Sequence, residues 1–99
     1  MGKNSRPQVV DRSMTVANPE SGSITMFSTS WCGYCRRLKS QLDREGIPFT
    51  EVDIERDSES ARFVEKVNRG NQTVPTILFP DGSAATNPSV IEVKQRLGV

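Results

Sequence analysis

The stretch 24–35 reads ITMFSTSWCGYC and decides most of what can be said about the fold. Its first five residues are mainly apolar and end at a serine, which predicts a short buried strand. Two cysteines three residues apart follow, at the point where an amphipathic helix is expected to begin. A Cys-x-x-Cys pair within a strand–helix–strand pattern is typical of a redox site in a protein of a reducing compartment.

Apolar spacing extends this pattern along the chain. Leu38 and Leu42 lie four residues apart and predict a helix over about 33–45, which Gly46 ends. A third strand is expected at 76–79, and Asp81-Gly82 predicts a hairpin turn into a short fourth strand.

The segment 49–54 is expected to form the second strand. Its apolar side chains are placed on one face and its acidic side chains on the other, with an irregularity at Thr50. The apolar set is Phe49, Val52 and Ile54, and the acidic set is Glu51, Asp53 and Glu55.

Two more helices complete the predicted order β-α-β-α-β-β-α. Asp57 or Ser58 caps the second helix, which ends near Gly70, and Ser89 with Glu92 forms a capping box for the last. The first strand–helix–strand unit implies parallel strands, and the hairpin adds an antiparallel edge. We therefore expect an α/β fold, a four-stranded mixed sheet with three helices covering its two faces.

Composition excludes several classes of protein. The 99 residues are 34% hydrophobic, which suits one globular domain, and thirteen basic against twelve acidic residues leave a net charge of +1. This balance predicts neither a nucleic-acid nor a membrane partner. With no histidine and two cysteines, the chain lacks the residues for a Ser-His-Asp triad, a Cys-His pair or a four-thiolate zinc site, so we expect no metal.

The composition changes near residue 23. The preceding residues are polar, carry Pro7, Pro19 and Gly22, and are expected to be a disordered extension of a domain at 24–99. They contain no signal-peptide core, and no segment has the roughly 18 apolar residues of a membrane helix. We therefore expect a cytoplasmic protein, where a cysteine pair is more often catalytic than structural.

The helix position gives the cysteines different expected roles. Cys32 lies at the helix start, where unpaired backbone N–H groups and the helix dipole stabilise a thiolate. Such positions lower the pKa of a thiol from about 8.5 to roughly 3.5–7.5. We expect Cys32 to be exposed and to attack, and Cys35, one turn on, to be sheltered and to resolve a mixed disulfide. The alternatives are half of a metal site shared with another chain, or two incidental thiols.

The tripeptide Thr73-Val74-Pro75 precedes the third strand. On local sequence alone, Pro75 most simply begins an edge segment, because only about 5–6% of X–Pro bonds in folded proteins are cis. The alternative is a cis-proline loop beside the cysteines, with the Val74 backbone free to pair with an extended substrate.

Over residues 24–99 the chain resembles the glutaredoxins, in its strand, WCGYC, helix, TVP, DG hairpin and last helix. The resemblance implies a thioredoxin-like fold, Cys32 as nucleophile, Cys35 as second cysteine and a cis Pro75. It also implies that Thr73 and Val74 line the groove that holds the thiol cofactor.

Glutathione-using members of that family commonly carry Gly-Gly and then Ser/Thr-Asp after the hairpin, whereas residues 83–89 here read SAATNPS. The motifs TSWCGYC, DIE, VNRGNQTVPT, DGS and TNPS are instead similar to the mycoredoxins of mycothiol-producing actinobacteria. This closer resemblance implies monothiol reduction of protein–mycothiol mixed disulfides. Mycothiol would be the reducing co-substrate, mycothiol disulfide reductase an indirect partner, and the protein a monomer with no tightly bound cofactor.

Four further residues are candidates for the substrate groove. Trp31 and Tyr34 are candidates for a wall of the substrate groove. The alternative for Trp31 is that its ring only shields the end of the first strand. Thr86 and Asn87, with Ser89, lie where the family's groove meets the last helix, although helix capping is the simpler role.

Two other functions stay open. One is a redoxin reduced by thioredoxin reductase that supplies ribonucleotide reductase, a family that usually ends in a Ser-Gly-Phe type segment absent here. The other is a dimer bridged by a [2Fe–2S] cluster, held by Cys32 of each chain and two thiol cofactors.

Overall fold

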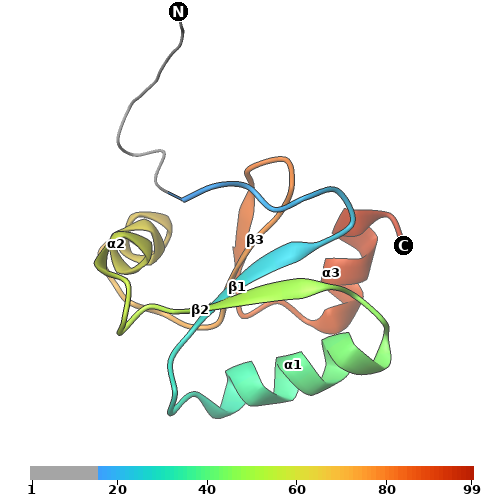
Figure 1. Ribbon diagram of the computed structural model, residues 1–99, viewed down its shortest axis with the longest axis horizontal. Coiled ribbons are helices and arrows are strands. Elements are labelled where there is room, and N and C mark those ends of the chain that lie inside the picture. Colours follow the sequence, from blue (N-terminus) through green and yellow to red (C-terminus); the bar gives the residue numbers. More distant parts are fainter. Residues whose placement is uncertain (1–15) are drawn as a thin grey trace, which may run out of the picture.

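The computed structural model describes residues 16–99. It contains four strands and three helices in the predicted order. Figure 1 labels all of them except β4. Their bounds are β1 (Ile24–Ser28), α1 (Gly33–Arg44), β2 (Phe49–Asp53), α2 (Ser58–Val67), β3 (Thr76–Leu78), β4 (Ala84–Thr86) and α3 (Val90–Leu97).

The strands form one mixed sheet in the order β2-β1-β3-β4. β1 and β2 are parallel, whereas β3 is antiparallel to both β1 and β4. The hairpin predicted at Asp81-Gly82 joins β3 to β4, and Gly82 has a φ of 89°, a conformation that glycine adopts readily. The predicted sheet, with its parallel pair and antiparallel edge, is confirmed.

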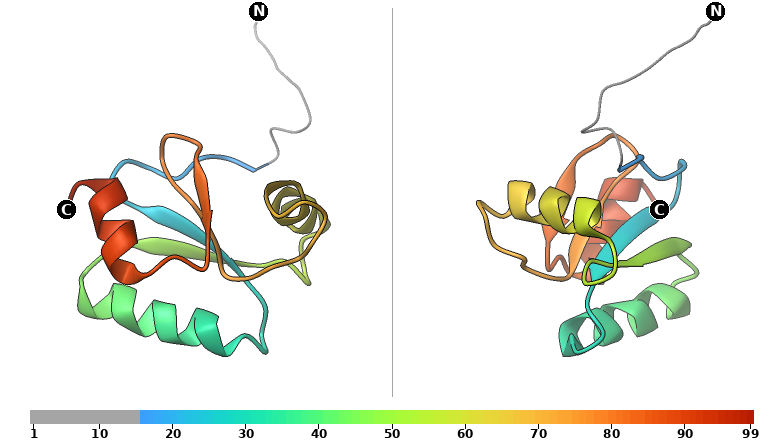
Figure 2. Two further views of the ribbon diagram at one scale, coloured as in Figure 1. Left: turned by 180° about the vertical axis from the view of Figure 1, so that it is seen from behind. Right: turned by 60° about the vertical axis from the view of Figure 1, so that its left-hand side comes forward.

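Helices cover both faces of the sheet, as predicted. α1 and α3 lie against one face and α2 against the other (Figures 1 and 2). The first core, between the sheet and α1 with α3, consists of Ile24, Met26, Cys32, Cys35, Leu38, Leu42, Ile47, Ile77, Phe79 and Val93. The second core, under α2, consists of Phe27, Ile54, Val64 and Leu78. The cysteines therefore belong to the first core.

The sequence prediction for β2 is wrong about its faces. Phe49 packs against the first core and Val52 against the second, so they do not share a face. The reason is that β2 alternates regularly, without the irregularity expected at Thr50. Glu51 consequently lies toward α1, where its carboxylate accepts hydrogen bonds from Ser28 Oγ at 2.7 Å and Lys39 Nζ at 3.0 Å.

Helix α1 carries the cysteines to the edge of the first core. Leu38 and Leu42 are both buried on its inner face, as their spacing predicted. The helix ends at Arg44, and Gly46, with a φ of 70°, turns the chain so that the Ile47 N–H donates to the Leu42 carbonyl at 3.0 Å.

The disorder predicted for residues 1–23 stays a prediction. Residues 1–15 lie outside the described residues, and Val16 packs against the second core. Within residues 16–99, no helix has the length and apolar character needed to cross a bilayer.

Candidate active site

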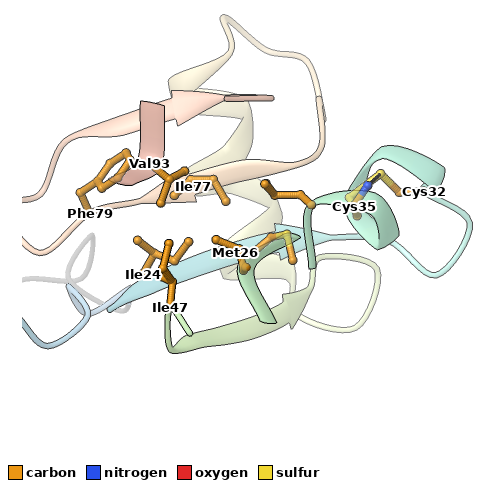
Figure 3. Close-up of a cluster of buried hydrophobic side chains, with 10 residues drawn as sticks. Ile24, Met26, Cys32, Cys35, Ile47, Ile77, Phe79 and Val93 are labelled. Carbon is orange, nitrogen blue, oxygen red and sulfur yellow. Dashed lines mark hydrogen bonds between the residues drawn. A yellow bond between two sulfur atoms is a disulfide. The ribbon is translucent and has the colours of Figure 1, made fainter. Parts of the chain in front are cut away.

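The cysteine pair lies at the junction of β1 and α1. Cys32 is the N-cap residue of α1, and Cys35 lies in the first turn of the helix. The two are joined by a disulfide, with their Cα atoms 5.2 Å apart. Figure 3 shows this disulfide at one end of the first core, beyond Met26 and Ile77. The helix thus brings two sulfurs together at the border between the core and the surface.

The surroundings of the Cys32 sulfur suit a negative charge. The Cys35 backbone N–H donates a hydrogen bond to Cys32 Sγ, with the N and S atoms 3.0 Å apart. The first turn of α1 carries no acidic residue. The positive end of the helix dipole and a backbone donor therefore both act on this sulfur, the conditions that favour a thiolate once the disulfide is reduced.

Both cysteines are buried in the oxidised form. Cys32 is 4% exposed and Cys35 is 1% exposed. The prediction that Cys32 is exposed is therefore wrong for this state, because its sulfur is bonded to a residue of the core. Only the sheltered position predicted for Cys35 is confirmed.

Two exposed aromatic residues flank the disulfide. Trp31 is 67% exposed and its indole Nε1 donates to Glu55 Oε2 at 3.0 Å. Tyr34 is 64% exposed, on the first turn of α1. Both rings are therefore accessible to solvent, and the role of Trp31 as a wall for the substrate stays a prediction.

The proline loop precedes β3. The Val74–Pro75 peptide bond is cis, as the family resemblance implied and contrary to the local expectation. The Val74 side chain packs against the first core, the cluster to which both cysteines belong, and Pro75 is fully buried. Within residues 16–99, the Val74 N–H and carbonyl make no hydrogen bond. Both groups are therefore free to pair with an extended substrate.

The Asn68 side chain holds this loop in place, a role that the sequence did not reveal. Its Nδ2 donates to the Val64 carbonyl at 2.8 Å and to Thr76 Oγ1 at 3.1 Å. Its Oδ1 accepts from Thr86 Oγ1 at 2.6 Å. Asn68 thus joins the end of α2 to the residue after Pro75 and to the end of β4, a set we call the Asn68 clamp.

The β4–α3 connection also contacts the proline loop. The Asn87 N–H donates to the Pro75 carbonyl at 2.7 Å, and Asn87 has a φ of 48°. Ser89 Oγ accepts from the Glu92 N–H at 3.0 Å, which confirms its predicted capping of α3. Thr86 and Asn87 do not share that role, because their hydrogen bonds hold the loop instead.

The carboxyl of Glu51 on β2 has a lowered pKa. The Ser28 hydroxyl, followed by Lys39, holds the pKa of this carboxyl below its ordinary value of 4.5. Glu51 is therefore ionised at neutral pH. Among residues 16–99, no three Cys, Asp or Glu side chains gather in a way that could hold a metal ion.

Comparisons with known proteins agree with this geometry. The family model described as glutaredoxin matches residues 24–83. A glutaredoxin-like protein of Mycobacterium tuberculosis is 53% identical over 77 residues, covering 78% of this chain and 92% of the relative. Mycoredoxin 1 of Corynebacterium glutamicum is 42% identical over 71 residues, covering 72% of this chain and 87% of the relative.

A solved structure shares the fold. The glutaredoxin of Methanosarcina mazei superposes with a TM-score of 0.68 at 24% identity, over 85% of each chain. The thioredoxin-like arrangement predicted from the sequence is thereby confirmed.

Proposed function

The chain belongs to the glutaredoxin family of thiol–disulfide oxidoreductases, and on that premise we propose that it reduces protein–mycothiol mixed disulfides through Cys32. The observation that carries this proposal is the position of the Cys32 sulfur. Its Sγ accepts a hydrogen bond from the Cys35 N–H at the start of α1, and Val74, whose backbone makes no hydrogen bond within residues 16–99, packs against the core to which both cysteines belong. A nucleophile and an unpaired backbone edge for a thiol compound thus border one core.

The proposed cycle has two exchange steps. The Cys32 thiolate attacks the mycothiol sulfur of the mixed disulfide, so that a Cys32–mycothiol bond forms and the protein leaves as a thiolate, which takes up a proton. A second mycothiol thiolate then attacks the mycothiol sulfur on Cys32. Mycothiol disulfide is released, Cys32 returns as a thiolate, and a mycothiol disulfide reductase with NADPH restores two mycothiols.

Cys35 is dispensable in this cycle. Its sulfur is buried and already bonds to Cys32 in the structure. In the reduced enzyme it can attack the Cys32–mycothiol adduct and release mycothiol, which gives the disulfide observed here. That side route removes Cys32 from the cycle until the disulfide is reduced again.

Seven residues are proposed to bind the thiol compound. The cysteine part of mycothiol would pair with the backbone of Val74, because both of its hydrogen-bonding groups are free. We propose that the rest of the binding surface comes from the exposed residues Trp31, Tyr34, Thr73, Thr86 and Asn87. Pro75 is buried and belongs to the proposed site as the residue that follows Val74.

The proposal of mycothiol as the reducing co-substrate rests on the similarity of this chain to known relatives. The 42% identity to Mycoredoxin 1 supports it, and residues 83–89 lack the Gly-Gly and Ser/Thr-Asp features of glutathione-using members. The proposed activity requires a reducing compartment such as the cytoplasm.

A coupled assay tests the proposal. Mycothiol, mycothiol disulfide reductase and NADPH are supplied with a protein–mycothiol mixed disulfide, and NADPH consumption is followed. Wild type and Cys35→Ser should turn over, and Cys32→Ser should not. Activity of Cys32→Ser with loss in Cys35→Ser would contradict the assigned roles, and turnover only with glutathione would contradict the cofactor.

A second function is favoured by the disulfide itself. A Cys32–Cys35 disulfide is the form that a thioredoxin reductase reduces, so the chain could instead pass electrons from that enzyme to ribonucleotide reductase. Replacing mycothiol and its reductase by thioredoxin reductase in the same assay separates the two. This alternative requires both cysteines, so Cys35→Ser would then be inactive.

A further inference from the structure

A hollow of about 280 Å³ opens between α1 and the β4–α3 connection. From α1 it is lined by Tyr34, Arg37, Leu38 and Gln41, and from the connection by Asn87, Pro88 and Ser89. This volume is close to the lower end of the range of about 300–1,000 Å³ found for small-molecule sites. The hollow is thus large enough for a group of one or two rings.

One end of the hollow lies close to the disulfide along the chain. Tyr34 is two residues from Cys32, within the first turn of α1. On the opposite wall, Asn87 is hydrogen-bonded through its N–H to the Pro75 carbonyl. Neither cysteine lines the hollow among the described residues, so a compound bonded to Cys32 would reach it past Tyr34 and Asn87.

The hollow has an apolar base and polar side chains around it. Leu38 is 4% exposed and Pro88 is buried, so they form an apolar base. Tyr34 adds a large exposed ring at the side. Such a surface packs against the carbon face of a saturated ring, as amphipathic aromatic residues do in many interfaces.

The polar side chains of the lining have unused hydrogen-bonding capacity. Within residues 16–99, those of Arg37, Gln41 and Asn87 form neither an ion pair nor a hydrogen bond. The amides of Gln41 and Asn87 each donate and accept. Hydroxyl groups on a ring also both donate and accept hydrogen bonds. The two amides therefore pair better with such hydroxyls than with a charged group. Among the residues that the structure describes, none that lines the hollow carries a carboxylate that could hold an ammonium group.

We propose that this hollow binds the sugar–cyclitol headgroup of mycothiol, an uncharged polyhydroxylated group, while the thiol lies at Cys32. This inference rests on the proposed function and deepens it. It assigns the selection of mycothiol to Gln41 and Arg37 on α1, outside the proline loop, with Tyr34 packing on the ring face. A thiol compound without such a headgroup gains nothing from these contacts.

The test compares two substrates that differ only in the headgroup. One peptide is prepared as its mixed disulfide with mycothiol and with N-acetylcysteine methylamide, which keeps the amide linkage and adds no charge, and kcat/KM is measured for each. Loss of one neutral hydrogen bond costs about 1 kcal/mol, or roughly fivefold. Gln41→Ala should therefore lower the ratio of the mycothiol to the methylamide value about fivefold, through KM. Gln95→Ala replaces an exposed glutamine of α3 outside the hollow and should leave the ratio as in wild type.

A second variant distinguishes hydroxyl recognition from anion binding. Arg37→Gln removes the positive charge but keeps donors, so under the proposal its ratio should fall less than threefold. A large fall for Arg37→Gln with none for Gln41→Ala would show an anion site and overturn the inference. An equal wild-type rate for both substrates would overturn the inference alone, whereas no wild-type turnover of the mycothiol substrate would overturn the proposed function as well.

Discussion

Replacing Asn68 by alanine removes the clamp that joins α2, the proline loop and β4. Three side-chain hydrogen bonds are lost, to the Val64 carbonyl, Thr76 Oγ1 and Thr86 Oγ1. A neutral hydrogen bond contributes about 0.5–1.5 kcal/mol net. The bond with Thr86 counts for less, since that residue is exposed, so we expect a loss of about 2–3 kcal/mol.

The lost free energy of unfolding should be measured by urea unfolding of the reduced protein. In a thermal unfolding scan the same loss should lower the melting temperature by about 10–20 °C, at roughly 4–8 °C per kcal/mol for a domain of this size. The protein should still fold, because natural domains have about 5–15 kcal/mol to lose. Thr76 keeps one partner, since its hydroxyl still donates to the Thr73 carbonyl at 2.8 Å.

Asn71→Ala is the matched control. Asn71 is exposed, and its side chain makes one bond, to the Asn68 carbonyl at 3.2 Å. It should cost about 0.5 kcal/mol or less. If Asn68→Ala cost no more than this control, the clamp would not stabilise the loop and the reasoning from its hydrogen bonds would be refuted. KM for the mixed disulfide should also rise in Asn68→Ala alone, because only that variant releases the loop.

Three further predictions concern single residues. Ser89→Ala removes the cap of α3 and should cost about 1 kcal/mol in urea unfolding, whereas Ser40→Ala on the exposed face of α1 should cost little. Gly46→Ala should cost about 1–2 kcal/mol, since Gly46 has a φ of 70° and an added Cβ would meet no atom within 4 Å, so the cost measures backbone strain alone. The pKa of Glu51 is lower in the folded state than its ordinary 4.5. The stability that the ionised carboxylate adds to the fold is therefore present above pH 4.5 and is lost as the pH falls through the pKa of the folded state. Glu51→Gln should therefore reduce the loss of stability on acidification below pH 4.5, and an unchanged acid profile would contradict the Ser28 and Lys39 contacts.

Most helices and strands could be predicted because each is determined by residues that lie close together in the sequence. Leu38 and Leu42 mark the buried stripe of α1, and the Asp81-Gly82 turn fixes the β3–β4 hairpin. In β2 the pattern misled, because the packing of Phe49 on the first core depends on which helix covers each face. That information resides in the tertiary arrangement.

The site was predicted where it follows from a motif and missed where it depends on long-range contacts. The helix-start position of Cys32 followed from the WCGYC motif, whereas the cis Pro75 was implied by the family resemblance and not by the local sequence. Asn68 lies in a stretch that reads as an ordinary helix end, and its partners include Thr86, eighteen residues away. The burial of Cys32 was not predicted either, although the spacing predicted that Cys35 can bond to it.

The start of α1 holds the reduced Cys32 sulfur as a thiolate in the proposed cycle. A titration of thiolate absorbance against pH, on Cys35→Ser to isolate one sulfur, tests this without any partner. We expect an ionisation midpoint well below the value of about 8.5 for a free thiol. A midpoint at or above that value would show that Cys32 is not activated by the helix, whatever the fold.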